Sequence, residues 1–327
     1  FKGTGVIKLN GAGLTHADLS GSTVSAVGEH AQTIDFSGAN LTNADLSGSR
    51  LTAASDNGDS LIDFTGADLA MANLRDSKFT TKIGSYDEDG EATIDFTEAN
   101  LAHADLSGSR LNADAEKGNA VVDFTEAILT HADLSGSKLF ADGGEYATID
   151  FNEANLANAV LSGSEVVTGG STGGTKATIG FKKANLANAD LKLWELEADG
   201  YYAYIDFSEA NLANADLRDS NIDAYTDYNE ATINFAEANL ANTDLRGSSL
   251  AAESRKGDTT IDFTKANLTN AELDGSMLTS VSGKGVLPKY AGVSTIDFTK
   301  ADLTNVDLSG SVLTTDNIIG LPLPPPP

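Results

Sequence analysis

The chain of 327 residues contains no cysteine, so disulfide bonds and thiolate chemistry are excluded and the redox compartment stays undetermined. Basic residues are scarce, because 21 Lys and Arg stand against 48 Asp and Glu, a formal net charge of -27. That balance argues against nucleic acid as a partner, since nucleic acid is bound through basic patches. No apolar run is long enough to span a bilayer, so no membrane insertion is expected. Nucleophile elbows, phosphate loops and zinc motifs are missing too, which predicts a protein that is not an enzyme.

What fills the chain is one repeated phrase that opens with phenylalanine and carries leucine five and ten residues later. One copy runs Phe96, Leu101, Leu106 and Leu111. The opening residues are Phe36, Phe64, Phe96, Phe124, Phe151, Phe181, Phe207, Phe235, Phe263 and Phe298, and one further copy without the Phe begins at Leu9. A period of five inside a period of roughly thirty indicates coils stacked along one axis, in place of a single central core.

Each unit of five residues offers two inward positions, the large central residue and the small or aliphatic residue two places before it. In the copy at Phe96 the second kind of position is held by Ile94, Ala99, Ala104 and Ser109. Alternation along a short strand turns both positions to the same side, and the fifth residue leaves room for a corner. Four units then close one coil. Because coils stack at a strand spacing of about 4.8 Å, the copies predict a rod on the order of 50 Å long.

Units such as ANLTNADLSG at 39–48 and ANLAHADLSG at 99–108 resemble those of the pentapeptide-repeat family. The resemblance implies an all-β fold, a right-handed four-sided parallel β-solenoid of about eleven coils over residues 1–313. Every coil but the last is followed by an insertion rich in Gly, Asp, Asn and Ser, such as 52–60. Such residues favour tight turns. We expect hairpin-like insertions along one edge, pairing from coil to coil and open to contacts with protein or carbohydrate.

The two ends of the rod carry the main functional prediction. Residues 314–327 are expected to form an extended proline-rich tail, because proline cannot continue a sheet. No capping helix is expected, so free strand edges and apolar side chains at both ends are suited to pairing with further copies. The contact candidates at the ends are Phe1, Val6, Ile7, Leu9, Leu313, Leu321 and Leu323. A head-to-tail contact does not close on itself, so it builds a homopolymer in the form of a filament.

Acidic residues recur in register, before the opening Phe as at Asp95 and before the third centre as at Asp105. Stacked carboxylates repel one another, which predicts raised pKa values or gathered cations, with Ca²⁺ as the one cofactor suggested. The alternative is a solvated surface that keeps the rod soluble. The weak metal candidates are Asp87, Asp89 and Glu91 in one loop, and His103 and His131 in one register of adjacent coils. The loop lacks the ligand spacing of a calcium-binding loop, and other coils place Asn where the histidines stand.

Trp194 stands in an inward slot that other copies fill with Ser. Because the slot is small, we expect the corner to bulge outward and the indole to be exposed. With Tyr201 and Tyr202 it would then form an aromatic contact surface for protein or carbohydrate. The alternative is a local aromatic cluster that packs on itself.

Together these features predict a non-enzymatic structural protein that stacks end to end, extracellular or at the cell surface. A chain that begins at Phe1 fits a product whose leader was removed, and equally an arbitrary boundary. Two alternatives stay open. Some pentapeptide-repeat proteins resemble duplex DNA and inhibit DNA gyrase, which the acidic balance fits and the insertions do not. The other alternative is an adhesin module that depends on Ca²⁺ or carbohydrate.

Overall fold

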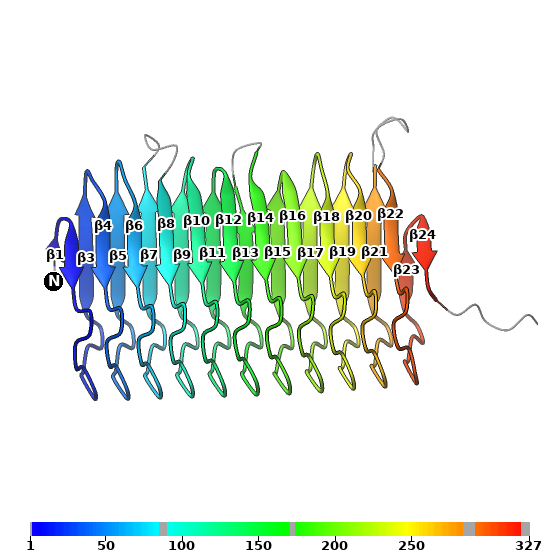
Figure 1. Cartoon of the computed structure of the whole chain (residues 1–327), viewed down its shortest axis with the longest axis horizontal. Coiled ribbons are helices and arrows are strands. Elements are labelled where there is room, and N and C mark those ends of the chain that lie inside the picture. The colour runs from blue at the N-terminus through cyan, green and yellow to red at the C-terminus, as the bar shows by residue number, and fades with distance from the viewer. Residues whose placement is uncertain (1, 85–89, 171–173, 284–291, 322–327) are drawn as a thin grey trace, which may run out of the picture.

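The computed structural model describes residues 2–84, 90–170, 174–283 and 292–321, and it shows a straight rod with a row of arms along one side (Figure 1). Within these residues all regular structure is β-strand. None of them forms a helix of the length and apolarity that crossing a membrane requires.

The arms contain two parallel sheets of twelve strands each. Sheet A consists of β1 (Lys2–Gly3), β3 (Thr23–Gly28), β5 (Arg50–Ser55), β7 (Lys78–Ile83), β9 (Arg110–Ala115), β11 (Lys138–Gly143), β13 (Glu165–Gly169), β15 (Glu195–Gly200), β17 (Asn221–Thr226), β19 (Ser249–Ser254), β21 (Met277–Ser282) and β23 (Val312–Thr314). Sheet B consists of β2 (Val6–Lys8), β4 (Gln32–Asp35), β6 (Ser60–Asp63), β8 (Glu91–Asp95), β10 (Asn119–Asp123), β12 (Tyr146–Asp150), β14 (Lys176–Gly180), β16 (Tyr202–Asp206), β18 (Ala231–Asn234), β20 (Thr259–Asp262), β22 (Ser294–Asp297) and β24 (Asn317–Ile319).

The insertions are arches rather than hairpins, which corrects one detail of the prediction. Consecutive strands such as β5 and β6 lie in different sheets, and β5 pairs in parallel with β3 and β7 of the adjacent coils. The two strands of an arch therefore enclose buried side chains, and Ala53 and Ile62 are both fully buried. The predicted pairing from coil to coil is confirmed. Each insertion adds one strand to sheet A and one strand to sheet B, and the two sheets pack face to face beside the coils.

Below the arms, the five-residue rhythm forms the predicted coils. Parallel bridges join one residue of each coil to the next in a continuous ladder from Gly13 through Asn155 to Asp302. Three corners of a coil lie at residues with positive φ, for example Glu98 (57°), His103 (60°) and Gly108 (65°). This left-handed region favours Gly and Asn, which explains the Gly of the SGS segments and the Asn that most coils place at the register of His103.

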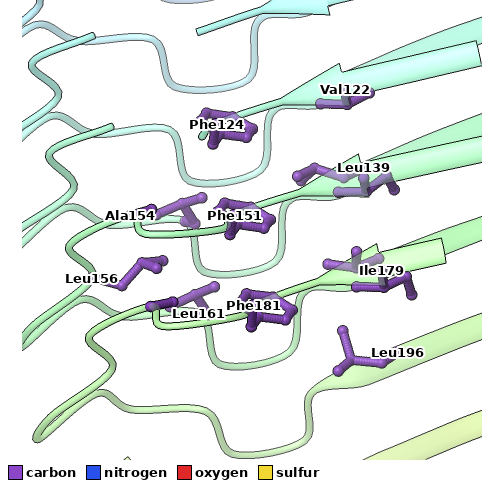
Figure 2. Packing of buried hydrophobic residues seen from close by; sticks show 14 of the residues in the cluster. Val122, Phe124, Leu139, Phe151, Ala154, Leu156, Leu161, Ile179, Phe181 and Leu196 are labelled. Carbon is purple, nitrogen blue, oxygen red and sulfur yellow. The ribbon is translucent and has the colours of Figure 1, made fainter. Parts of the chain in front are cut away.

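The core is a set of columns that run along the rod. The opening phenylalanines stack on one another, and the ring centroids of Phe124 and Phe151 lie 4.8 Å apart with planes 1° from parallel (Figure 2). Phe151 and Phe181 lie 5.0 Å apart. Leucines such as Leu156 and Leu161 are buried beside them. Burying each such side chain contributes roughly 1.5–3 kcal/mol, so stability comes from contacts between neighbouring coils.

Trp194 is fully buried, so the prediction of an exposed indole on a bulging corner is wrong. Its ring meets Phe181 edge-on at 5.2 Å and Phe207 at 6.2 Å. The physical reason is space inside the coil. At the same slot the hydroxyls of Ser109 and Ser137 are buried without a hydrogen-bond partner in the described structure, so the slot does not require a polar side chain.

The Asn column before the second centre forms the hydrogen-bonded ladder that the sequence suggests. Asn185 Nδ2 donates to Asn155 Oδ1 at 3.1 Å, and Asn211 Nδ2 donates to Asn185 Oδ1 at 3.1 Å. The ordered structure also extends past residue 313. β24 lies inside the segment 314–327, which was expected to be an extended tail, and it pairs with β22. The reason is that residues 317–319 supply one more apolar strand before the prolines begin.

Candidate interaction surfaces

Both ends of the described rod present apolar side chains along its axis. In the first coil (residues 9–24), Leu9, Leu14 and Leu19 are only partly buried and line a hollow of about 160 Å³. In the last coil (residues 298–313), Leu308 and Leu313 are likewise partly buried against the core. These are the positions whose counterparts in interior coils are fully covered by the next coil.

The end candidates named from the sequence divide into three groups. Val6 is half exposed, at 53%, while Ile7 and Leu9 pack partly against the core. Leu313 and Leu321 also pack partly against it. Phe1 and Leu323 lie outside the described residues. The structure adds Ile318 and Ile319 of β24, which are 47% and 46% exposed. They were not among the predicted contact residues, because this segment was expected to be part of the tail.

The tyrosines near the tips of the arms form a cluster that packs largely on itself. Tyr201 stacks on Tyr228 at 5.6 Å and meets Tyr202 edge-on at 5.4 Å. Lys256 lies over the Tyr228 ring at 4.5 Å. The Tyr204 hydroxyl donates to Glu230 at 3.0 Å. Burial, helped by this bond, raises the pKa of Tyr204 to about 12. Trp194 takes no part, since it is inside the coil, so the predicted joint surface of Trp194, Tyr201 and Tyr202 does not exist.

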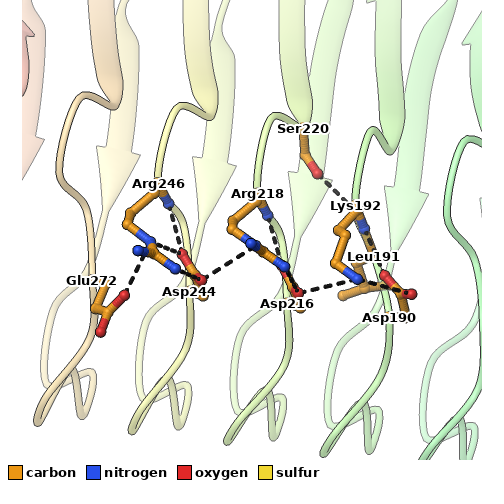
Figure 3. Close-up of polar contacts among 9 residues, drawn as sticks. All are labelled: Asp190, Leu191, Lys192, Asp216, Arg218, Ser220, Asp244, Arg246 and Glu272. Atoms are coloured by element: carbon orange, nitrogen blue, oxygen red, sulfur yellow. Dashed lines mark hydrogen bonds and ion pairs between the residues drawn. The ribbon is translucent and has the colours of Figure 1, made fainter.

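A row of alternating charges runs across four coils, beside the coil turns just below the strands, and we call it the ion-pair row (Figure 3). Its members are Asp190, Lys192, Asp216, Arg218, Asp244, Arg246 and Glu272. Arg218 reaches Asp216 at 2.7 Å in its own coil and Asp244 at 3.3 Å in the next. Lys192 bridges Asp190 and Asp216 in the same way, at 3.2 and 3.3 Å. Each cation thus fastens one coil to another.

The ion-pair row reverses the expected behaviour of the acidic column. Hydrogen bonds from Arg218, with help from Lys192, lower the pKa of Asp216 to about 2. The prediction of raised pKa values is therefore wrong at this residue, because cations two residues further along the chain neutralise the column. The signal was present in the sequence as a basic residue after Asp-Leu in three coils, at Lys192, Arg218 and Arg246.

The sequence comparison adds to this geometry. A sequence model described as pentapeptide repeats matches the chain in eight copies, at residues 34–55 and 94–112. The matched residues coincide with the coil corners and centres described above. The chain is a pentapeptide-repeat protein.

Solved structures of other pentapeptide-repeat proteins match the chain at low sequence identity and low TM-score. HetL of the cyanobacterium Nostoc sp. strain PCC 7120, described as involved in heterocyst differentiation regulation, is 20% identical, with 92% of this chain and 90% of that chain covered and a TM-score of 0.29. QnrB1, a plasmid-mediated fluoroquinolone resistance protein, is 14% identical, with 81% and 93% covered and a TM-score of 0.20. No curated protein sequence matches the chain significantly.

The metal candidates are only partly brought together in this pentapeptide-repeat protein. The rings of His103 and His131 stack at 4.9 Å, as their shared register predicts. Glu91 lies in β8 and accepts a hydrogen bond from Thr93, while Asp87 and Asp89 lie outside the described residues. Across the described part of the chain, no group of three or more His, Cys, Asp or Glu side chains is arranged to hold a metal ion. Binding of Ca²⁺ stays an untested prediction.

One carboxyl of the other acidic column does follow the prediction. Burial raises the pKa of Asp150 to about 6, and the Asp123 carboxylate adds to the shift, against hydrogen bonds from the Asn152 backbone N–H and Nδ2. The next coil has Gly180 in this register, and a Cβ there would approach Asp150 Oδ1 to 2.9 Å. The glycine thus makes room for a carboxyl that is pressed against the sheet.

Asp150→Asn is expected to stabilise the rod at neutral pH and not at acid pH. The unfolded carboxyl titrates near pH 4, so between about pH 4 and pH 6 the native state holds a proton that the unfolded state has released. Native stability therefore falls as pH rises through that window. Removing the charge should raise the free energy of unfolding at pH 7 by roughly 1–3 kcal/mol. Urea unfolding at pH 4 and pH 7 measures it.

Asp18→Asn is the matched control, because hydrogen bonds from the Ser20 hydroxyl and backbone N–H lower the pKa of Asp18. Its effect should have the opposite pH dependence, with a loss of stability that appears as pH rises through the acid range. An equal gain from Asp150→Asn at both pH values would contradict the assignment of the effect to the carboxylate charge.

Proposed function

We propose that this pentapeptide-repeat chain is a non-enzymatic structural protein whose rods join end to end into filaments, outside the cell or at the cell surface. The observation that carries the proposal is the pair of apolar end faces. Leu9, Leu14 and Leu19 at one end and Leu308 and Leu313 at the other are the same core positions that every interior coil covers. A further copy placed on the axis would set these two apolar faces opposite each other.

Free strand edges at both ends favour the same contact. β1 and β2 are the first strands of sheets A and B, and β23 and β24 are the last. Their outward edges offer backbone N–H and C=O groups to another parallel strand. Since all neighbours in both sheets are parallel, a copy added in the same orientation continues both sheets without changing their geometry.

Strand counting decides the arrangement of such a joint. β1 lies one layer before the first coil, since it pairs with β3, and β24 lies one layer after the last coil, since it pairs with β22. If the last coil rested directly on the first coil of the next copy, β24 and the next copy's β2 would occupy one layer. The joint we propose therefore places β23 beside the next copy's β1 and β24 beside its β2. One coil layer, about 4.8 Å thick, then remains open between the apolar faces.

Two observations favour this structural function over the alternatives. A mimic of DNA needs uninterrupted negative charge, whereas the ion-pair row places Lys192, Arg218 and Arg246 among its carboxylates. An adhesin that binds carbohydrate through a flat aromatic platform is less favoured, because Tyr201 and Tyr228 stack on each other and Lys256 lies over the Tyr228 ring, although Tyr228 remains 49% exposed.

Electron microscopy of the purified chain tests the proposal directly. We expect filaments whose axial repeat is close to one rod length plus the open layer. The variant Ile318→Lys/Ile319→Lys places two charges at the β24 edge and should leave dispersed single rods. Met71→Lys/Ile128→Lys is the control, because both residues are exposed on the coil sides, at 58% and 42%. Single rods from the unaltered chain at high concentration would refute end-to-end joining. Protease treatment of intact source cells tests the surface location separately.

A further inference from the structure

The outward face of sheet A is divided into a basic half and an acidic half. Counting outward side chains of the described strands, β1 to β11 carry six cations and two carboxylates, and β13 to β23 carry six carboxylates and no cation. The cations of the first half are Lys2, Arg50, Lys78, Lys82, Arg110 and Lys138, and its two carboxylates are Asp114 and Asp142. The carboxylates of the second half are Glu165, Glu195, Glu197, Asp199, Asp223 and Glu253. For a chain with a net charge of -27, a basic half-sheet of this size is unexpected.

Like charges are adjacent in one register of the basic half, whereas in another register Lys82 forms an ion pair with Asp114 at 2.8 Å. Arg50, Lys78, Arg110 and Lys138 occupy one register on four neighbouring strands, about 4.8 Å apart. Only at the boundary between the halves does this register change sign, where Lys138 forms an ion pair with Glu165. Charges so arranged repel one another in a single rod, and the repulsion is relieved when the opposite charge covers them.

In the acidic half, too, neighbouring charges of one sign repel one another. Asp223 Oδ1 is buried and has no hydrogen-bond partner in the described structure. Burial, followed by the nearby Glu253 and Glu197 carboxylates, raises the pKa of Asp223 to about 6. Burial and the Glu197 carboxylate also raise the pKa of Asp199. A partner that brings cations to this surface would favour the ionised form of Asp223.

We propose that sheet A is the docking surface for a second copy of this chain, packed face to face with the two rods antiparallel. The two-fold axis runs parallel to the strands, midway between β11 and β13, with six strands of sheet A on either side. β9 then lies over β15 of the second copy, β7 over β17 and β5 over β19. Arg110 faces Glu195 and Glu197 of the second copy, and Lys78 lies between its Glu195 and Asp223.

The centre of this interface is apolar and self-complementary. Phe140 and Val167 are adjacent in register on β11 and β13, so the axis passes between them and each residue faces the other one in the second copy. A surface hollow of about 430 Å³ lies there, with Phe140, Val167 and Gly169 in its lining. Arg110 lies over the Phe140 ring at 4.7 Å. Aromatic and arginine side chains at the centre of an interface commonly dominate the binding energy.

The area and the charge pattern both favour a second copy as the occupant. Twelve strands at about 4.8 Å and arms of about 18 Å give roughly 1,000 Å² per copy, against the roughly 800 Å² of a standard interface. A parallel arrangement of two rods would place like charges together. Only reversal of one rod brings every half over its opposite, and it also places the exposed Val27 at one end of the sheet over Val281 of the second copy.

Sedimentation equilibrium in the Ile318→Lys/Ile319→Lys background, which removes joining through the ends, tests the pairing. We expect a mass twice the 33.8 kDa of one chain, with dissociation as salt is added. Arg50→Glu/Lys78→Glu/Arg110→Glu and Glu195→Lys/Glu197→Lys/Asp199→Lys should each be monomeric, with dissociation constants raised at least about 100-fold. An equimolar mixture of the two variants should form a dimer again, because each half then meets its opposite. Circular dichroism confirms that both variants are folded.

The control Lys182→Glu/Lys183→Glu/Lys265→Glu makes the same charge change on exposed coil residues and should leave the dimer intact. Orientation is tested by disulfide formation, since the chain has no cysteine of its own. Asn112→Cys/Glu197→Cys should cross-link two chains, and either single substitution should not. A monomeric parent, a dimer that survives the basic-half reversal, a mixture that stays monomeric, or cross-linking by Asn112→Cys alone would each overturn the proposal.

Discussion

Replacing Phe151 with alanine is expected to lower the free energy of unfolding by about 3–5 kcal/mol. Phe151 is fully buried and its ring lies between those of Phe124 and Phe181, at 4.8 and 5.0 Å. Neither neighbour is able to fill the gap, because each is held in register by its own coil. The removed ring therefore leaves a cavity along the column and two neighbouring phenylalanines that each lose one stacking partner. Urea unfolding followed by circular dichroism measures the loss.

Tyr146→Ala is the control for this experiment. Tyr146 lies in the strand that leads to Phe151, but its side chain is 45% exposed. Its removal is expected to change stability by no more than about 0.5 kcal/mol. A loss below about 1 kcal/mol for Phe151→Ala would contradict the view that stacking between coils holds the rod together, since this column runs through ten coils.

The position of the cavity along the rod is expected to matter as well as its size. A solenoid is stabilised by contacts between neighbours, so a defect in a middle coil weakens the coupling between two half-rods. Hydrogen exchange of Phe151→Ala should show lost protection spreading over the adjacent coils. Phe298→Ala, in the last coil, has one phenylalanine neighbour instead of two. It should cost less and confine the loss to that end.

The sequence predicted the coils because their cause is local. Leucine at every fifth residue, a small residue two places before it, and Gly or Asn at the positions with positive φ each follow from the geometry of one short strand and one corner. The same local signals predicted the Asn ladder. They also predicted strands in the insertions, but not arches. Whether β5 pairs with β6 or with β7 depends on what the next coil offers, which one insertion does not show.

The surfaces were harder to predict because they depend on register between coils. The ion-pair row depends on Arg218 reaching a carboxylate in the next coil, and the charge division of sheet A depends on Arg50, Lys78 and Arg110 being neighbours although they lie about thirty residues apart in the chain. Each residue by itself is an ordinary exposed cation. Once the coils are aligned, they form one patch. Aligning the copies by their phenylalanines would have revealed both patterns from the sequence.

Trp194 shows where a pattern of residue types reaches its limit. The repeat marks its position as a small inward slot, since other coils place serine there. A repeat reports which residue usually stands in a slot and not how much space surrounds it. In the structure the indole is fully buried between Phe181 and Phe207. The space around the slot is the quantity that the sequence does not contain.

The fluorescence of the native protein is expected to report this burial directly, because Trp194 is the only tryptophan of the chain. An indole enclosed by apolar rings should emit at short wavelength and should be protected from acrylamide until the rod unfolds. An exposed indole on a bulging corner would emit at long wavelength and be quenched freely. Urea titration should therefore shift the emission in one step with the loss of β-structure around the coil of Trp194.

Trp194→Ser restores the residue that the repeat prefers, yet it is expected to destabilise the protein by about 3–5 kcal/mol. The neighbouring backbone and the rings of Phe181 and Phe207 are arranged around the indole, so its removal leaves a cavity that a serine hydroxyl does not fill. The indole Nε1 has no hydrogen-bond partner in the described structure, so the substitution breaks no side-chain hydrogen bond of Trp194, and the expected loss of stability comes from packing. Trp194→Phe keeps an aromatic ring in the slot and should cost much less. If Trp194→Ser were neutral or stabilising, the slot would close around serine, and the volume argument for this coil would be wrong.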